Sequence, residues 1–500
     1  MSGESGLVGG RVRRFALLSW ADKDGTRQNP TLPENLMSHP SPLTTHHSPT
    51  RDHARAIWQS AVDAANPREL VRAALNDPEL PLRDALPGAR RILVAGAGKA
   101  GAAMCQGVED ALDEPALDKL EGTVNVPDFS DPPPLKKLSL HGARPVGSNH
   151  PTARGVEGAE KILTLFASAG PEDVGLCLIS GGGSALLPAP VADVSLEDKQ
   201  AVTRLLHACG ATINEMNAVR KHLSRVKGGR LAQTFLGEGR PEGGRALFSL
   251  IISDVIGDPL DVIASGPTAP DPTTFQTALD VLDKYQLSAR VPQTVRDHLE
   301  RGARGEVPET PKTLSGKVHN FVLDNNARSL RAAQSTAEQL GYRVLNLGSF
   351  LEGETRHAAV TLAGIVRSIL ADGVPLSPPA CVLSGGETTV TLTAEHGLGG
   401  RNQEFVLSAA LYLSQHTRPH DAGRWAVLSG GTDGEDGPTD AAGALADADT
   451  LGRATAFLRL DPQAFLDRHD AYHFFEATGD LLQTGLTQTN VMDVRVFLIG

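Results

Sequence analysis

The sequence predicts an α/β protein built from two α/β domains, each organised around a sheet whose strands alternate with helices. Short apolar runs that end in glycine, serine or aspartate are typical of buried strands, and stretches with helical periodicity lie between them. Strands that alternate with helices in this way form parallel sheets. The apolar runs stand at 91–95, 122–126, 174–179, 246–252, 321–323, 344–347, 380–384 and 425–429.

Helical periodicity and composition divide the chain further. Helices are expected at 53–75, 327–340 and 354–371. A segment rich in Gly, Pro, Glu and Lys at 302–317 is typical of a linker, so we expect a first domain at 51–310 and a second at 311–500. Residues 1–50 carry no sustained apolar period, and we expect a disordered leader there, or a start codon assigned too early.

Composition argues against two classes of protein. The formal net charge of the 500 residues is −12, whereas nucleic-acid binding needs a basic surface. We find no apolar stretch long enough to cross a membrane. The four cysteines lie far apart without a C-x-x-C pair, which favours reduced thiols and a cytoplasmic protein. The sequence does not determine the oligomeric state, and a homo-oligomer stays open.

A glycine-rich turn follows the first predicted strand. Gly96-Ala97-Gly98-Lys99-Ala100-Gly101 matches G-x-G-x-x-G, the dinucleotide fingerprint, at the start of a predicted helix. Backbone N–H groups at such a helix start bind anions, and Lys99 adds a point charge that suits a carboxylate or a phosphate. The acidic residue that the fingerprint also requires is missing, because Asp128 stands too far along the chain. A plain strand-to-helix turn with a solvated lysine is the alternative.

A second glycine turn follows the strand at 174–179. It contains Ser180, Gly181, Gly182, Gly183 and Ser184, a backbone cradle suited to an oxyanion. The strand at 246–252 leads to Asp254 and Asp258. Ligands gather at the carboxyl ends of strands in open α/β sheets, and carboxylates there hold Mg²⁺ or orient a hydroxyl. A flexible turn and helix capping are the structural alternatives.

Cations are concentrated in one stretch of this acidic chain. It contains Asn217, Arg220, Lys221 and Lys227. The stretch is either an anion-binding surface or an ordinary solvated helix face, and its composition does not decide between them.

Three glycine-rich segments in the second half carry further charge. Glu387 lies in the first, and Arg401, Asn402 and Glu404 follow a run of glycines. Glycines let the backbone approach closely, and an arginine framed by them can hold a carboxylate or phosphate by two hydrogen bonds. The loop at 430–440 contains four acids, among them Asp433 and Asp436, which suits a hard cation or a solvated turn.

In their order along the chain these motifs resemble the glycerate kinase family that makes 2-phosphoglycerate, whose carboxy-terminal part is the MOFRL domain. The matching segments are 96–100, 180–187, 217–224, 227–232, 253–255, 264–268, 271–274, 399–404, 430–443, 479–481 and 489–491. The resemblance implies a Rossmann-like first domain, a MOFRL-type second domain, an active cleft between them, ATP, Mg²⁺ and glycerate. It also implies that Lys99 and Arg401 are the two key cations.

The site expected from motifs and resemblance has three parts. Lys99, Arg401 and Asp254 are the expected catalytic residues, with Asp254 orienting or deprotonating the glycerate hydroxyl. Asp258, Asp433 and Asp436 are the expected metal ligands. The expected substrate and ATP contacts are Gly96, Gly98, Ser180, Gly181, Gly182, Gly183, Ser184, Asn217, Arg220, Lys221, Lys227, Glu387, Asn402 and Glu404.

Two other functions stay open at this point: an NAD(P)H-dependent hydroxypyruvate reductase, favoured by the G-x-G-x-x-G match, and a non-enzymatic sugar-acid sensor. One segment also departs from the family pattern. The family tends toward Thr-Gly-Pro-Thr-Gly-Thr-Asn, whereas residues 484–490 read Thr-Gly-Leu-Thr-Gln-Thr-Asn. The loss of a proline and a glycine changes the backbone conformations open to this loop.

Overall fold

A computed structural model describes residues 48–128, 132–145, 150–237, 245–314, 317–421 and 423–500. The expected leader at 1–50 lies outside these residues except for its last three. There Ser48 caps helix α1 (Pro49–Ala64) by accepting a hydrogen bond from the Arg51 N–H. The helix expected at 53–75 is two helices, α1 and α2 (Pro67–Asn76), because Pro67 cannot continue a helix and instead begins the next one, with Asn66 as its N-cap.

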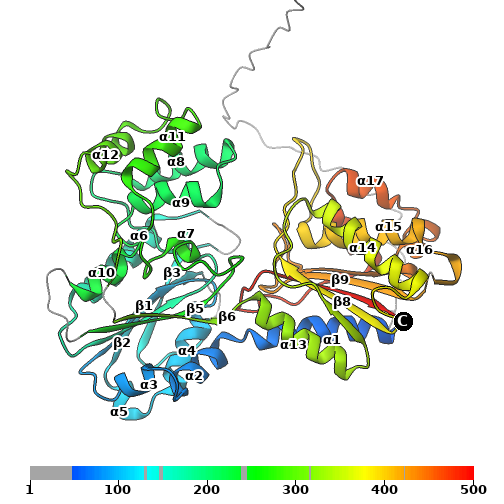
Figure 1. Cartoon of the computed structure of the whole chain (residues 1–500), viewed down its shortest axis with the longest axis horizontal. Coiled ribbons are helices and arrows are strands. Elements are labelled where there is room, and N and C mark those ends of the chain that lie inside the picture. Colours follow the sequence, from blue (N-terminus) through cyan, green and yellow to red (C-terminus); the bar gives the residue numbers. More distant parts are fainter. Residues whose placement is uncertain (1–47, 129–131, 146–149, 238–244, 315–316, 422) are drawn as a thin grey trace, which may run out of the picture. The chain divides into compact units, whose positions relative to one another are not determined.

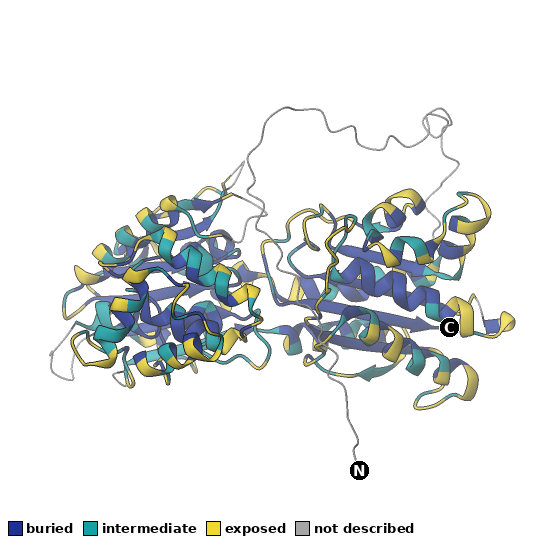
Figure 2. Cartoon of the chain, turned by 90° about the horizontal axis from the view of Figure 1, so that it is seen from above, coloured by how far each residue is buried: buried dark blue, intermediate teal, exposed yellow. Residues whose placement is uncertain are grey.

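The first sheet has six strands, all parallel to their neighbours, in the order β3-β2-β1-β4-β5-β6. Their bounds are β1 (Ile92–Ala97), β2 (Leu120–Pro127), β3 (Leu138–Arg144), β4 (Val174–Ile179), β5 (Ala246–Ile252) and β6 (Val318–Asp324). This is the strand order of the doubly wound dinucleotide-binding fold, and the direction of winding reverses between β1 and β4. The central strands β1 and β4 are fully buried, because helices cover both faces of such a sheet, whereas β3 and β6 at its edges are partly exposed (Figure 2).

The helices around the first sheet fall into two groups. Those beside the strands are α2, α3 (Leu82–Ala85), α4 (Gly101–Ala111), α5 (Glu114–Leu117), α6 (Ala153–Ala167), α7 (Gly183–Leu186) and α10 (Arg230–Leu236). A second group has its own apolar core and lies apart from the strands in Figure 1: α8 (Leu196–Ala208), α9 (Ile213–His222), α11 (Phe275–Lys284) and α12 (Gln293–Ala303). These four helices were not predicted from the sequence as a separate group.

The second sheet has six strands in the order β11-β10-β9-β12-β8-β7. Their bounds are β7 (Arg343–Asn346), β8 (Ala380–Gly386), β9 (Trp425–Gly431), β10 (Gly443–Asp447), β11 (Leu481–Leu482) and β12 (Asp493–Ile499). Only β7 and β8 pair in parallel, and the other neighbours are antiparallel. The prediction of an α/β protein with a parallel first sheet is confirmed, and the second sheet is mixed.

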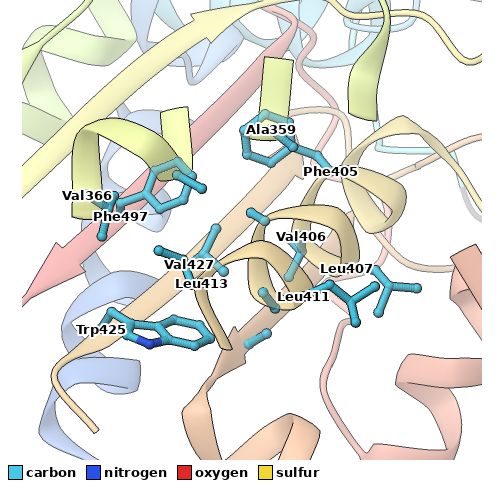
Figure 3. Packing of buried hydrophobic residues seen from close by; sticks show 14 of the residues in the cluster. Ala359, Val366, Phe405, Val406, Leu407, Leu411, Leu413, Trp425, Val427 and Phe497 are labelled. Carbon is cyan, nitrogen blue, oxygen red and sulfur yellow. The ribbon is translucent and has the colours of Figure 1, made fainter. Parts of the chain in front are cut away.

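Each face of the second sheet is covered by helices. Helices α1 and α13 (Asn326–Gln339) pack on the face that carries Cys381 and Leu383. Helices α14 (Thr355–Asp372) and α15 (Arg401–His416) pack on the opposite face, where Phe405 and Val406 meet Val427 and Phe497 (Figure 3). The remaining helices of this half are α16 (Ala448–Ala456), α17 (Pro462–Asp467) and α18 (Ala471–Thr478). The alternation of β8 residues between the two cores follows from the two-residue period of a strand.

Helix α1 therefore precedes the first sheet in the chain but packs against the second.

All four cysteines are free, and Cys105, Cys177 and Cys381 are buried. Within the described part of the chain, no helix combines the length and the apolar character that crossing a membrane requires.

Candidate active site

The turns that follow β1 and β4 form one unit at the point where the winding of the first sheet reverses. The Lys99 N–H donates to the Gly181 carbonyl at 2.8 Å, and the Ala100 N–H donates to Ser180 Oγ at 3.0 Å. A Cβ at Gly98 would lie 1.9 Å from Ser180 Oγ, and one at Gly96 would lie 2.0 Å from the Leu178 carbonyl oxygen. These two glycines are required by the close approach of protein atoms, whatever ligand the turns hold.

Lys99 lies between two carboxylates from the second half of the chain. Its Nζ is 2.8 Å from Asp433 Oδ2 and 3.1 Å from Glu435 Oε2, and its side chain is half-buried. Burial disfavours the charged ammonium, but Asp433 and Glu435 outweigh it and raise the pKa of Lys99 above its usual value. Lys99 is therefore a fixed positive charge.

Asp254 stands beside the second glycine turn, where a Cβ at Gly181 would lie 2.6 Å from its Oδ2. The carboxylate accepts a hydrogen bond of 3.3 Å from Asn490 Nδ2. Burial raises the pKa of Asp254 to about 6, with Asp433 adding to the shift and Lys99 and the Gly182 N–H opposing it. A carboxyl group with such a pKa can accept a proton near neutral pH.

Arg401 begins α15 and is the second expected key cation. Its Nε and Nη2 donate to the two carboxylate oxygens of Asp493 at 2.8 and 2.9 Å, and its Nη1 lies 3.2 Å from Glu387 Oε1. Burial raises the pKa of Glu387, with Asp493, Asp254 and Asp433 adding to the effect and Arg401 opposing it. The pKa of Glu387 therefore responds to carboxylates that follow strands of both sheets, and the direct contact between the two halves at this point is the Lys99–Asp433 ion pair.

A cavity of about 410 Å³ opens beside Arg401. Val390, Leu392 and Pro438 contribute apolar walls, and Glu387 lines it as well. Its volume lies within the range of small-molecule sites.

Three other expected residues anchor the start of α15. The Asp436 carboxylate accepts from the backbone N–H groups of Asn402 and Gln403 at 3.0 and 2.8 Å and is fully buried. Glu404 is also buried, and it accepts from Arg356 Nε and pairs with His469 Nδ1. These contacts give Asn402, Glu404 and Asp436 a structural task, and both oxygens of Asp436 are engaged by N–H donors.

The expected cationic stretch faces the second glycine turn. Arg220 Nη2 and Lys227 Nζ both donate to Ser184 Oγ, and Lys227 also reaches the Ser184 carbonyl at 2.9 Å. Asn217 takes part through Ser265 Oγ, which donates to its Oδ1 at 3.0 Å. Lys221 differs, because Asp261 and Asp271 neutralise it at 3.0 and 3.2 Å. The solvated-helix interpretation is wrong for this stretch, since Lys227 is 2% exposed.

Sequence reasoning missed Lys199, which joins this group from α8. It is buried, and its Nζ finds no hydrogen-bond partner among the described residues. Burial lowers the pKa of Lys199 to about 7, and Arg220 and Arg230 add to the shift. No carboxylate of the described chain forms an ion pair with Lys199, Arg220 or Lys227. These three side chains form a cluster of basic groups, called here the Ser184 cation site, and burial lowers the pKa of Lys227 well below its usual value as well.

The expected metal ligands are dispersed. Asp258 accepts a hydrogen bond from Asn325, Asp433 pairs with Lys99, and Asp436 caps α15. Among the residues that the structure describes, no group of three or more His, Cys, Asp or Glu side chains is placed to hold a metal ion.

A doubly wound sheet whose reversal point carries glycine turns, buried basic side chains and a buried carboxyl group is typical of an α/β enzyme that acts on small molecules. Known proteins narrow this class. Residues 53–300 match the family model described as a domain of unknown function, DUF4147, and residues 380–493 match the MOFRL family. The chain belongs to the glycerate kinase family that joins these two domains, so the resemblance carried by the motifs is confirmed.

Individual relatives cover most of the chain. A glycerate 2-kinase of Pyrococcus horikoshii is 39% identical over 82% of this chain and 87% of its own length. A putative hydroxypyruvate reductase of Agrobacterium vitis is 42% identical over 90% of this chain and 94% of its own. The crystal structure of a glycerate kinase from Thermotoga maritima superposes with a TM-score of 0.76 at 34% identity, covering 90% of this chain and 99% of that one.

Proposed function

We propose that this chain transfers the terminal phosphoryl group of ATP to the 2-hydroxyl of glycerate, giving 2-phosphoglycerate. The Ser184 cation site supports this proposal most directly. In the described part of the chain, these two lysines and the arginine have no carboxylate partner. Protonating the buried lysines without a ligand is therefore costly, and a bound polyanion would offset that cost. The triphosphate of a nucleotide supplies negative charge, and the turn at 180–184, which follows β4, adds backbone N–H donors.

Phosphoryl transfer depends on positioning and charge neutralisation. Lys99 would bind oxygens of the moving phosphoryl group, and Arg401 would provide a second positive charge. The hydroxyl oxygen of glycerate forms the new P–O bond as the bond between the terminal phosphorus and the bridging oxygen of ADP breaks. Asp254 takes the hydroxyl proton, which suits a carboxyl group whose pKa is about 6. The cavity beside Arg401 has room for the uncharged part of the nucleotide.

Magnesium fits the carboxylates around Lys99 better than the wider set of expected ligands. Hard oxygen donors suit Mg²⁺, which commonly uses one or two carboxylates together with substrate phosphates. Asp433 is half-buried and lies close to Asp254, so Asp433 would hold the ion. The bound ion would neutralise charge on the phosphate oxygens. The contacts of Asp436 and Asp258 make them weaker candidates.

A hydroxypyruvate reductase is the second candidate, because relatives carry that name and the turn at 96–101 matches the dinucleotide fingerprint. Two contacts weigh against it. Ser180 fills the space beside Gly98, and the Asp128 carboxylate after β2 pairs with both terminal nitrogens of Arg154 at 2.9 and 2.7 Å. The acidic residue that the structure describes at the end of that strand is thus engaged by an arginine rather than by a ribose hydroxyl. Family membership also argues against a sensor without enzymatic activity.

The architecture supports two further parts of the proposal. The two sheets favour two domains, with the boundary between β6 and β7 rather than near residue 310, and with α1 assigned to the second domain. Four free cysteines support the cytoplasm as the compartment.

An enolase-coupled assay tests the reaction. Purified protein with D-glycerate and Mg-ATP should yield 2-phosphoglycerate, which enolase converts without any mutase. A signal that appears only after addition of phosphoglycerate mutase would show that the product is the 3-phosphate. Oxidation of NADH by hydroxypyruvate, with no ATP-dependent loss of glycerate, would instead establish the reductase.

A further inference from the structure

Arg144, the last residue of β3, is a buried arginine that none of the motifs included. It is 1% exposed. Among the described residues, its Nε and Nη2 have no hydrogen-bond partner. A buried guanidinium is normally paired, because removing its N–H groups from water without replacement costs free energy. Burial accordingly lowers the pKa of Arg144, with Glu435 opposing the shift.

The two free nitrogens are those with which other arginines of this chain bind carboxylates. Arg401 uses Nε and Nη2 to hold both oxygens of Asp493. Arg90 uses the same pair for Asp173, at 3.1 and 2.9 Å. The edge formed by Nε and Nη2 matches the spacing of two carboxylate oxygens. Arg144 thus keeps an unused edge of the shape that selects a carboxylate.

The position of Arg144 places this edge at the candidate active site. A Cβ at Gly182 would lie 3.1 Å from Arg144 Nη2 and 3.5 Å from Lys99 Cγ. Gly182 has a φ of 75°, a conformation that glycine adopts readily, and it carries no side chain that would fill the space beside the guanidinium. Its N–H also acts on the Asp254 carboxylate. Arg144, Lys99 and Asp254 therefore surround the same turn.

We propose that Arg144 binds the carboxylate of the hydroxy-acid substrate through Nε and Nη2. This assignment rests on the proposed function. The 2-hydroxyl of glycerate is attached to the carbon next to the carboxylate, whereas the 3-hydroxyl is one carbon further away. A carboxylate held at Arg144 therefore restricts which hydroxyl reaches Asp254, and Arg144 acts as a specificity residue. Lys99 is then not needed for the carboxylate and acts on the phosphoryl group.

Arg144→Lys and Arg144→Gln test the assignment. Each should raise the KM for D-glycerate by roughly 10²-fold, the effect of two lost hydrogen bonds to a charged group, while the KM for ATP changes little. Arg144→Lys should not restore the KM, because an ammonium lacks the two parallel N–H donors with which a guanidinium holds both oxygens of a carboxylate. Arg154→Lys, which alters an exposed ion pair with Asp128, is the matched control and should keep both values.

Two measurements without turnover complete the test. Calorimetry should detect binding of D-glycerate and glycolate to the wild type and to Arg154→Lys, and much weaker binding to both Arg144 variants. Arg144→Met should raise the ligand-free melting temperature by a few degrees, because it removes an unpaired buried charge. A lower melting temperature together with unchanged glycolate affinity would overturn the proposal.

The outcomes separate this inference from the proposed function. Phosphorylation of glycerate with an unchanged KM in Arg144→Gln would contradict the inference alone. Glycolate binding that depends on Arg144, in a protein that never phosphorylates glycerate, would contradict the kinase proposal and support the carboxylate site. A melting temperature that rises with inorganic phosphate but not with glycolate, and no longer rises in Arg144→Gln, would show that Nε and Nη2 of Arg144 bind a phosphate. The carboxylate assignment would then be wrong.

Discussion

The guanidinium of Arg401 holds both carboxylate oxygens of Asp493, at 2.8 and 2.9 Å, where α15 begins beside β12. Asp493 is fully buried and also accepts hydrogen bonds from Asn402 at 2.9 Å and Arg495 at 3.0 Å. Arg401 is itself 28% exposed at its side chain and reaches Glu387. One residue therefore stabilises the junction of a helix with a strand and presents positive charge to the candidate site.

Replacement of Arg401 should affect both stability and catalysis. Arg401→Met leaves the buried Asp493 without its two-point partner, and removal of one partner of such a pair costs about 3–5 kcal/mol, which the remaining contact to Arg495 will reduce. We expect kcat/KM to fall by roughly 10²–10³, the usual effect of losing a group that stabilises transition-state charge. Kinetics should be measured well below the melting temperature, with circular dichroism as the control for folding.

Arg401→Lys separates the two effects. The lysine restores a charge near Asp493 but not the fork, so stability should recover more than kcat/KM. Full recovery of kcat/KM would show that Arg401 contributes charge alone. Wild-type kinetics in a folded Arg401→Met protein would remove Arg401 from the site.

Lys99 should behave differently from Arg401. Its partners Asp433 and Glu435 are only partly buried and can regain water, so Lys99→Met should change the free energy of unfolding by about 1 kcal/mol or less. We expect kcat/KM to fall by roughly 10²–10³. If Lys99 and Arg401 act on one developing charge, the double variant should lose less than the sum of the two single losses in activation free energy. Simple additivity would indicate two independent roles.

The raised pKa of Asp254 predicts an acid limb in the pH profile. Because burial raises this pKa to about 6, kcat/KM should fall as pH drops through 6, where the base becomes protonated. Asp254→Asn should lose most of its activity and the acid limb with it. Survival of the limb in the residual activity of Asp254→Asn would assign it to another group.

The free energy of unfolding should also depend on pH through the titration of Asp254. The folded protein binds the Asp254 proton more readily than the unfolded chain does, so burial of this carboxylate costs stability above pH 6 and the cost disappears as pH falls toward 4. Asp254→Asn should thus gain stability relative to the wild type at pH 8 and lose this advantage at pH 4.

The sequence was sufficient for the parts of the fold that local pattern encodes. The strands at 174–179 and 246–252 coincide with β4 and β5, because apolar runs bounded by turn residues define a buried strand. Strand β3 was not predicted, because it is flanked by polar residues in the sequence and several of its own residues are half-exposed, so it forms no apolar run. Strand β12 was missed although it is fully buried, and no pattern indicated that it pairs between β8 and β9.

The site was predictable where glycines and charges form motifs and not where it depends on burial. Lys99 and Arg401 stand in glycine frames that can be read directly from the chain. Arg144 and Lys199 are single cations in segments without a motif. Only the fold shows that both are buried, and that Nε and Nη2 of Arg144 and Nζ of Lys199 have no hydrogen-bond partner among the described residues. A count of charges cannot distinguish them from solvated surface residues.

The loop that departs from the family pattern gives a stability prediction. Gln488 occupies the position where the family tends to have glycine, and its φ is 62°. A residue with a Cβ pays about 1–2 kcal/mol for this left-handed conformation, so Gln488→Gly should stabilise the protein by about 1 kcal/mol. Leu486→Gly is the control, because Leu486 is not in that conformation and a glycine there should destabilise. Equal effects of the two substitutions in urea unfolding would refute this explanation.

The last prediction concerns Lys199 in the Ser184 cation site. Because burial and the neighbouring arginines lower its pKa to about 7, the folded protein resists protonation that the unfolded chain accepts at up to about pH 10. The cost to stability should therefore appear as pH falls from 10 to 7 and stay constant below 7. Lys199→Met should unfold at a higher temperature than the wild type at pH 7, and the difference should nearly vanish at pH 10.

If a nucleotide triphosphate binds here, ATP should raise the melting temperature of the wild type more than that of Lys199→Met, since only the wild type has the unpaired charge to neutralise. Lys119→Met, at a lysine that donates to the Pro87 carbonyl on the surface, is the matched control and should change neither quantity. An equal response to ATP in Lys199→Met and the wild type would place the triphosphate elsewhere.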